Sequence, residues 1–235
     1  MKRAWINFLF LTALILQTAC GTPATPPSPT ATPVPPPTAT LSTKALTEGI
    51  FSAAREDDLV AMNEYIAVGA DLNATDENGA TALSIAAYRG NTEMIRVLLD
   101  SGATFEIGVF HVAITQSKDN TEIVRAFIDH GADLDQKAEI GNGHTALMYA
   151  AEFGHVEVGK LLLANGADID AVDNYNDPAL NVAAFHGQLE FAKMLVEMGA
   201  ELDVRGYANQ TALGHAISRG HEEVAAFLQG VGATE

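Results

Sequence analysis

Residues 143–167, with the sequence GHTALMYAAEFGHVEVGKLLLANGA, decide how this chain folds. Apolar residues recur at helical spacing from Leu147 to Ala151, Gly154 interrupts them, and a second apolar stripe runs from Val156 to Leu163. This pattern predicts two short helices joined by a tight turn. Helices of this length are marginal in isolation, and each of these buries only one face, so the unit needs a neighbour against which it can pack.

The same unit recurs along the chain. Thr-Ala-Leu opens the first helix of three units, at Thr81, Thr145 and Thr211, and Pro178-Ala-Leu occupies the same phase in a fourth unit. Gly-Ala dipeptides follow the second helices at intervals of 29 to 35 residues. Self-similarity at this period predicts a stacked array of repeats. The dipeptides begin at Gly69, Gly102, Gly131, Gly166, Gly199 and Gly232.

The unit closely resembles the ankyrin repeat, whose signature is Thr-Pro-Leu-His-x-Ala-Ala, a Gly-His turn, a Leu-Leu-Leu helix and Gly-Ala-Asp. The resemblance covers six units, in residues 44–235. It implies an all-helical solenoid of about six helix-turn-helix units joined by finger loops. It also implies a protein–protein interaction module without enzymatic activity, which binds its partner through a concave groove and the finger loops.

The resemblance also indicates which residues contact a partner, because in this family the two residues before each turn glycine face the groove, and finger-loop positions such as Tyr175 and Tyr207 add to this surface. Aromatic and arginine side chains are typical anchors of binding surfaces, although single exposed aromatics are also ordinary. We expect the aromatic groove residues to be exposed and to supply apolar contact, and the arginines to supply directed hydrogen bonds. The predicted partner-binding residues are Tyr88, Arg89, Phe153, Tyr175, Phe185, His186, Tyr207 and Arg219.

Two features predict details of the finger loops. Ala113 comes only 11 positions after Gly102, whereas Ala86 comes 17 positions after Gly69, so we expect a gap in the row of fingers at the third unit. One loop position carries only glycine or asparagine, the residue types that most readily accept a left-handed backbone. We therefore predict a left-handed conformation at Gly79, Gly143, Asn176 and Asn209.

The sequence gives little support for catalysis or metal binding. Acidic or amide pairs such as Asp168 and Asp170 recur once per unit and could bind calcium, but such side chains commonly bond their own loop backbone. No two histidines stand three or four residues apart, and nucleophile and phosphate-loop motifs are missing. We expect no enzyme activity, no metal and no cofactor. A structural or chaperone-like envelope protein and a metal-dependent hydrolase stay open as alternatives.

The charge of the chain restricts its partners. The formal net charge is −17, with 13 basic and 30 acidic residues. Phosphate binding needs clustered lysine and arginine, so nucleic acid is not an expected partner. Acidity of this extent favours solubility and basic protein partners, and we expect a monomer.

The first twenty residues have the layout of an export signal. Lys2 and Arg3 precede an apolar run from Ala4 to Leu16, and small residues lead to Cys20, the only cysteine of the chain. This segment resembles a bacterial lipoprotein signal, although Gln17 departs from its pattern. The resemblance implies that residues 1–19 are removed and that Cys20 is lipidated. An ordinary secretory signal, or an uncleaved anchor, is the alternative.

Residues 20–43 predict a tether. Eight of the nine prolines lie here, among threonine, alanine and serine, without a charged residue before Lys44. Proline-rich chain of this kind is extended and semi-rigid. We therefore expect an exported protein that is either lipid-anchored to the bacterial cell membrane or periplasmic or extracellular, and the tether would hold the array away from a surface.

Overall fold

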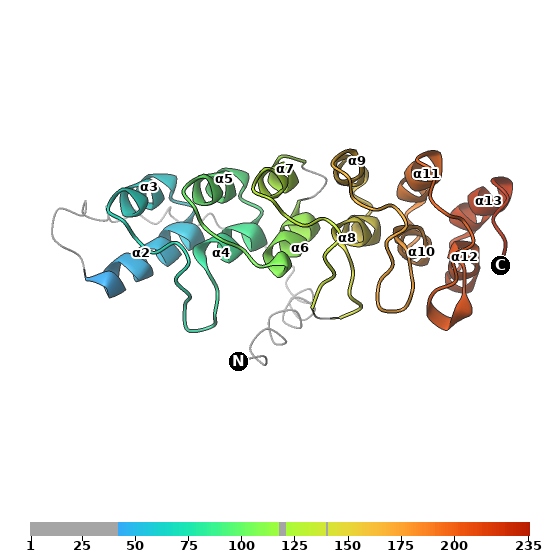
Figure 1. Ribbon diagram of the computed structural model, residues 1–235, viewed down its shortest axis with the longest axis horizontal. Coiled ribbons are helices and arrows are strands. Elements are labelled where there is room, and N and C mark those ends of the chain that lie inside the picture. Colours follow the sequence, from blue (N-terminus) through green and yellow to red (C-terminus); the bar gives the residue numbers. More distant parts are fainter. Residues whose placement is uncertain (1–41, 118–120, 140) are drawn as a thin grey trace, which may run out of the picture.

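The computed structural model describes residues 42–117, 121–139 and 141–235. The predicted signal peptide, Cys20 and nearly all of the tether lie outside these residues. The described residues form twelve α-helices and one 3-10 helix, arranged as six helix-turn-helix units in a single curved row (Figure 1). The predicted all-helical solenoid is confirmed. None of the described helices is long and apolar enough to cross a membrane.

The helices form two rows, and the finger loops project on the side of the first row (Figure 1). Each first helix packs against the first helix of the next unit, and each second helix stacks in the same way. The first helices are α2 (Thr43–Glu56), α4 (Ala82–Arg89), α6 (Ile107–Gln116), α8 (Ala146–Phe153), α10 (Ala179–Phe185) and α12 (Ala212–Arg219). The second helices are α3 (Leu59–Ala67), α5 (Thr92–Asp100), α7 (Thr121–Asp129), α9 (Val156–Ala164), α11 (Leu189–Glu197) and α13 (Glu222–Gly230).

The core follows directly from the repeated apolar positions. The leucine of each Thr-Ala-Leu or Pro-Ala-Leu triplet is buried, as is a leucine of the matching second helix, so one continuous core runs through the array. Each unit covers the open face of its neighbour, which is why short helices are stable here. These leucines are Leu83, Leu147, Leu180 and Leu213, and Leu98, Leu162, Leu195 and Leu228.

Both predictions about the finger loops are confirmed. Six residues join α5 to α6, whereas 14 residues join α3 to α4, and no long loop descends ahead of α6 in Figure 1. The left-handed loop position also recurs as expected. Its φ angles are 81° at Gly79, 74° at Gly143, 65° at Asn176 and 60° at Asn209.

The recurring acidic and amide pairs tie consecutive units together. In three of the four pairs the first residue accepts a hydrogen bond from the backbone N–H of the second, as Asp168 does from Asp170 at 3.1 Å. The second residue then accepts from the backbone N–H of the next unit, as Asp170 does from Glu201 at 2.9 Å. These side chains therefore join consecutive units by hydrogen bonds, in addition to the expected hydrogen bonds within their own loops. The same link joins Asn73 to Thr104, Asp135 to Asp168 and Asp203 to Thr234.

Candidate functional site

A cleft of about 310 Å³ lies where the finger loops of the fifth and sixth units meet α10 and α12. The loops hold their positions through links between neighbours: Asn174 N–H donates to Asn142 O at 2.9 Å, and Asn176 Nδ2 donates to Arg205 O at 2.8 Å. The cleft is lined by Asn142, His144, Asp173, Tyr175, Asp177, Asn181, Val182, Phe185, His186, Tyr207, His215 and Arg219.

Asp173 shapes the loop that carries Tyr175. Its Oδ1 accepts hydrogen bonds from the backbone N–H groups of Tyr175 at 2.7 Å and Asp177 at 3.0 Å. Such a turn satisfies the loop backbone with a side chain and fixes its path. Tyr175 is consequently held at the rim of the cleft, with its side chain exposed.

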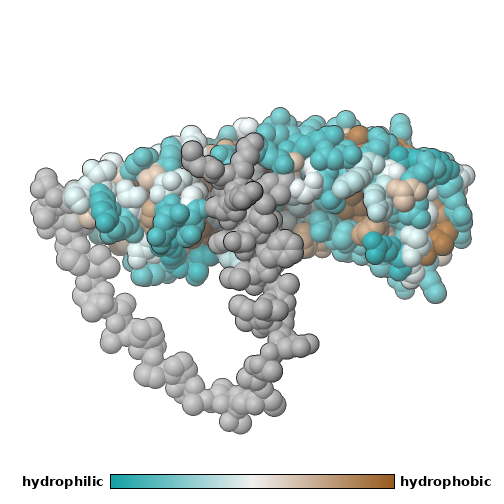
Figure 2. Space-filling view, turned by 90° about the horizontal axis from the view of Figure 1, so that it is seen from below, coloured by the Kyte–Doolittle hydropathy of each residue, from teal (hydrophilic) through white to brown (hydrophobic). Residues whose placement is uncertain are grey.

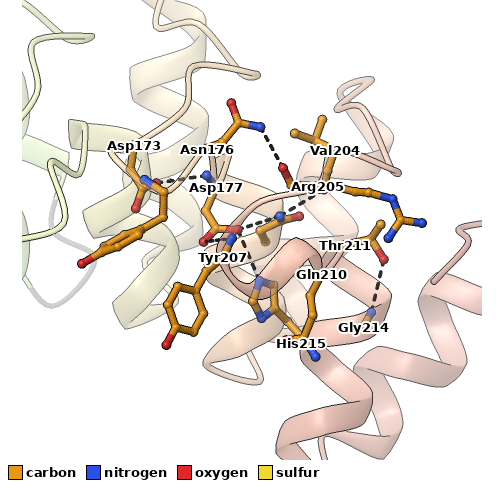
Figure 3. Close-up of polar contacts among 12 residues, drawn as sticks. Asp173, Asn176, Asp177, Val204, Arg205, Tyr207, Gln210, Thr211, Gly214 and His215 are labelled. Carbon is orange, nitrogen blue, oxygen red and sulfur yellow. Dashed lines mark hydrogen bonds and ion pairs between the residues drawn. The ribbon is translucent and has the colours of Figure 1, made fainter.

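Asp177 connects the fifth unit to the sixth (Figure 3). Its Oδ1 accepts from Asn181 Nδ2 at 2.8 Å and lies 3.3 Å from His215 Nε2, while its Oδ2 accepts from the backbone N–H of Tyr207 at 3.1 Å. Burial alone would raise the pKa of Asp177. The hydrogen bonds from His215, Asn181 and Tyr207 outweigh burial and hold that pKa below its ordinary value, so Asp177 is a carboxylate at neutral pH.

A second histidine lies beside the other carboxylates. His144 is buried, with Nε2 3.5 Å from Asp173 Oδ2 and Nδ1 3.6 Å from Glu152 Oε2. The hydrogen bond from His144 lowers the pKa of Glu152, against the opposing effect of burial. The inner wall of the cleft is therefore rich in hydrogen-bond acceptors that carry negative charge.

The rim of the cleft is aromatic. Tyr175 and Tyr207 meet edge to face with ring centroids 5.5 Å apart, a favourable geometry for aromatic pairs. Phe185 lies edge-on to His215, and the Arg219 guanidinium lies 3.7 Å from the Phe185 ring centroid. A short cation–π contact of this kind is attractive, and it shows that an aromatic face at this cleft accepts a guanidinium.

The structure brings five of the eight predicted partner-binding residues to this cleft. They are Tyr175, Phe185, His186, Tyr207 and Arg219. The other three lie outside the cleft, at the ends of α4 and α8. They are Tyr88, Arg89 and Phe153, and all three are exposed.

One expectation is wrong. Phe185 is only partly exposed, because Arg219 covers its ring face and His215 packs against its edge. Both covering side chains belong to the following unit, so the packing between units partly buries a position that the family pattern places in the groove. The guanidinium of Arg219, which was expected to contact a partner, lies over the Phe185 ring of the same chain.

Sequence reasoning missed the polar interior of the cleft, which consists of His144, Asp173, Asp177, Asn181 and His215. A signal was present in the fifth unit. Asn181 takes the phase held by Ser84, Met148 and Gly214 in other units, and it is buried. A buried amide needs partners, and its position beside Asp177 could have marked this interface as polar.

The described part of the chain contains no group of three or more histidine, cysteine, aspartate or glutamate side chains that is arranged to hold a metal ion. His144 and His215 instead contact carboxylates, and the paired acidic residues of the finger loops accept backbone hydrogen bonds.

Comparisons with known proteins agree with this architecture. A family model described as ankyrin repeats (3 copies) matches residues 50–138 and 110–206. The chain is similar to the crystal structure of an ankyrin repeat domain from Acinetobacter baumannii, with 30% sequence identity and a TM-score of 0.67, over 79% of this chain and 98% of that one. A search of curated proteins gives no match. The chain belongs to the ankyrin repeat family.

Proposed function

We propose that this chain is an interaction module that binds a protein partner outside the cytoplasmic membrane, through the groove, the finger loops and the cleft between the fifth and sixth units. One observation carries the proposal: five residues chosen for their chemistry and repeat position lie around a single cleft. Ankyrin repeats are generally protein-interaction modules, and they are typically not enzymes.

The surface chemistry supports recognition of a protein. Tyr175 and Tyr207 are 49% and 55% exposed, and they stand beside buried acceptors. Aromatic anchors next to directed polar groups are typical of the centre of a protein interface. Figure 2, which views the molecule from the side toward which the finger loops point, shows a mostly hydrophilic face with separate hydrophobic areas.

The location rests on the sequence pattern of the N-terminus. In this proposal residues 1–19 are removed, Cys20 carries lipid, and residues 20–43 space the array from the membrane. Mass spectrometry of the mature N-terminus tests this directly. A lipid-modified peptide that begins at Cys20 supports the anchor, whereas an intact leader or cleavage at another residue contradicts it.

Partner capture tests the binding role. In intact cells, the amount of partner crosslinked to a variant with Tyr175→Ala and Tyr207→Ala should be at least tenfold lower than the amount crosslinked to the wild-type chain. Both side chains are exposed, so the free energy of unfolding should change by less than about 1 kcal/mol. Phe185 is unsuitable for this test because its ring packs between units.

The matched control is a variant with Val60→Ala and Met198→Ala, whose exposed side chains lie on α3 and just after α11. This control should retain the partner. Equal capture by wild type, the tyrosine variant and the control would contradict the proposed binding surface.

A further inference from the structure

Within the described residues, the carboxylates of Asp173 and Asp177 are not paired with a lysine or arginine, although Arg219 lines the cleft and Lys137 Nζ donates to Asp173 O at 3.4 Å. The side chains of Asp173 and Asp177 are 2% and 12% exposed. Within the described residues, the cationic groups at ion-pair distance from these carboxylates are the rings of His144 and His215, which are charged only when protonated. Burial of a carboxylate is costly unless it is paired, so the cleft favours a positively charged group.

Asn181 independently points to a missing hydrogen-bond donor. This residue is 1% exposed and lines the cleft. Its Nδ2 donates to Asp177 Oδ1 at 2.8 Å and to Val204 O at 3.2 Å. Both partners are acceptors, which fixes the orientation of the amide, and Oδ1 is left buried without a partner. A buried acceptor in this state costs free energy that a ligand donor would recover.

The size and the walls of the cleft restrict the donor further. A volume of about 310 Å³ is at the lower end of the range for ligand pockets, and it suits one side chain better than a cofactor. The exposed rings of Tyr175 and Tyr207 contact each other at the cleft, and aromatic rings attract cations. A net charge of −17 would also steer a basic segment toward the array.

We infer that this cleft binds an arginine or lysine side chain of the protein partner. The cationic head lies near the Asp173 and Asp177 carboxylates and donates to Asn181 Oδ1, while its aliphatic stem lies along the outer surface of the paired tyrosine rings. The inference rests on the proposed protein-binding function and adds the chemical class of side chain that the cleft recognises.

The experiment titrates fluorescent peptides onto the purified full-length chain in detergent and follows anisotropy. The probes are one flexible Gly/Ser peptide with three arginines and matched peptides in which the arginines are replaced by lysine or by glutamine. The arginine and lysine peptides should bind at least tenfold more tightly than the glutamine peptide. Equal binding of all three peptides would overturn the inference.

Two variants that add the same charge locate the binding site. Tyr207→Lys places a cation at the entrance, and Val60→Lys places one on the remote helix α3, where Val60 is 71% exposed. Tyr207→Lys should weaken binding of the arginine peptide at least tenfold, and Val60→Lys less than twofold. Equal effects of the two variants would overturn the inference, because binding would then reflect net charge alone.

Asp177→Asn gives a second test that removes charge from inside the cleft. It should weaken binding of the arginine peptide at least fivefold. Thermal unfolding monitored by circular dichroism should show that the variant is still a folded array. If this variant unfolds, the two lysine variants decide the question. Loss of peptide binding with intact partner capture in cells would reject only the cationic specificity, whereas failed capture with intact peptide binding would reject the proposed partner surface.

Discussion

Lowering the pH from 6.5 to 4 should reduce the free energy of unfolding of this array by about 3 kcal/mol through one residue, His111. Burial, with a smaller contribution from nearby His144, lowers the pKa of His111 from 6.5 to about 4. Both ring nitrogens of His111 are buried without a hydrogen-bond partner among the described residues, and the centroid of its ring lies 4.8 Å from that of the Tyr149 ring. Protonation in place would leave an unpaired charge inside the core.

The sign of the effect follows from proton binding. Between pH 6.5 and 4 the unfolded chain binds a proton at His111 and the folded chain does not, so the unfolded state gains stability as the pH falls. The stability contribution is fully present above pH 6.5 and is lost by about pH 4. Glu152 and Asp177, whose pKa values are also lowered, act in the same direction at lower pH.

His111→Leu tests this prediction, because leucine has similar bulk and cannot titrate. Urea unfolding of both proteins at pH 7, 5.5 and 4.5 should show a smaller loss of stability in the variant, with a difference of about 1.4 kcal/mol per pH unit below 6.5. Parallel stability curves for the two proteins would show that His111 does not control the acid sensitivity.

Gly206→Ala should remove about 2–3 kcal/mol of stability, through overpacking of the contact between the fifth and sixth units. A Cβ at this position would overlap the Asp177 carboxylate and would lie 3.0 Å from Asp177 Cα. Asp177 accepts from Tyr207 N–H and contacts His215, so its displacement would break the links that hold the cleft. The loss is measured by urea unfolding, and arginine-peptide binding should fall with it.

Gly108→Ala is the matched control, since Gly108 lies in α6 and a Cβ there would meet no atom within 4 Å. Alanine is favoured over glycine inside a helix, so this variant should be unchanged or slightly more stable. If Gly206→Ala unfolds at the same urea concentration as wild type, the close approach at Asp177 contributes nothing to the interface.

The fold could be predicted from sequence because the same local pattern of residues occurs in several units. The Thr-Ala-Leu triplets and their apolar stripes give the helices, and the substitution of glycine by asparagine at Asn176 and Asn209 gives the finger register. The short link between Gly102 and Ala113 gives the gap at the third unit. An atypical residue in one unit does not change the prediction, because the equivalent positions of the other units give the same repeat period.

The cleft was harder to predict because it depends on contacts across units. Tyr175, Tyr207 and Arg219 were found by residue type and repeat position, but their convergence with Asp177 is not encoded within one unit. His215 illustrates the difficulty. It lies one residue beyond the phase of His111, yet it is equally buried and contacts Asp177 of the preceding unit.

Site-specific photo-crosslinking in intact cells shows whether a protein partner occupies the cleft. A photoreactive residue replaces Tyr207 at the cleft in one variant and Val60 on the remote surface of α3 in the other, and the products are identified by mass spectrometry. We predict that position 207 yields one enriched exported protein, crosslinked through a segment that contains arginine or lysine, and that position 60 does not. The same products from both positions, or none from position 207, would contradict the account.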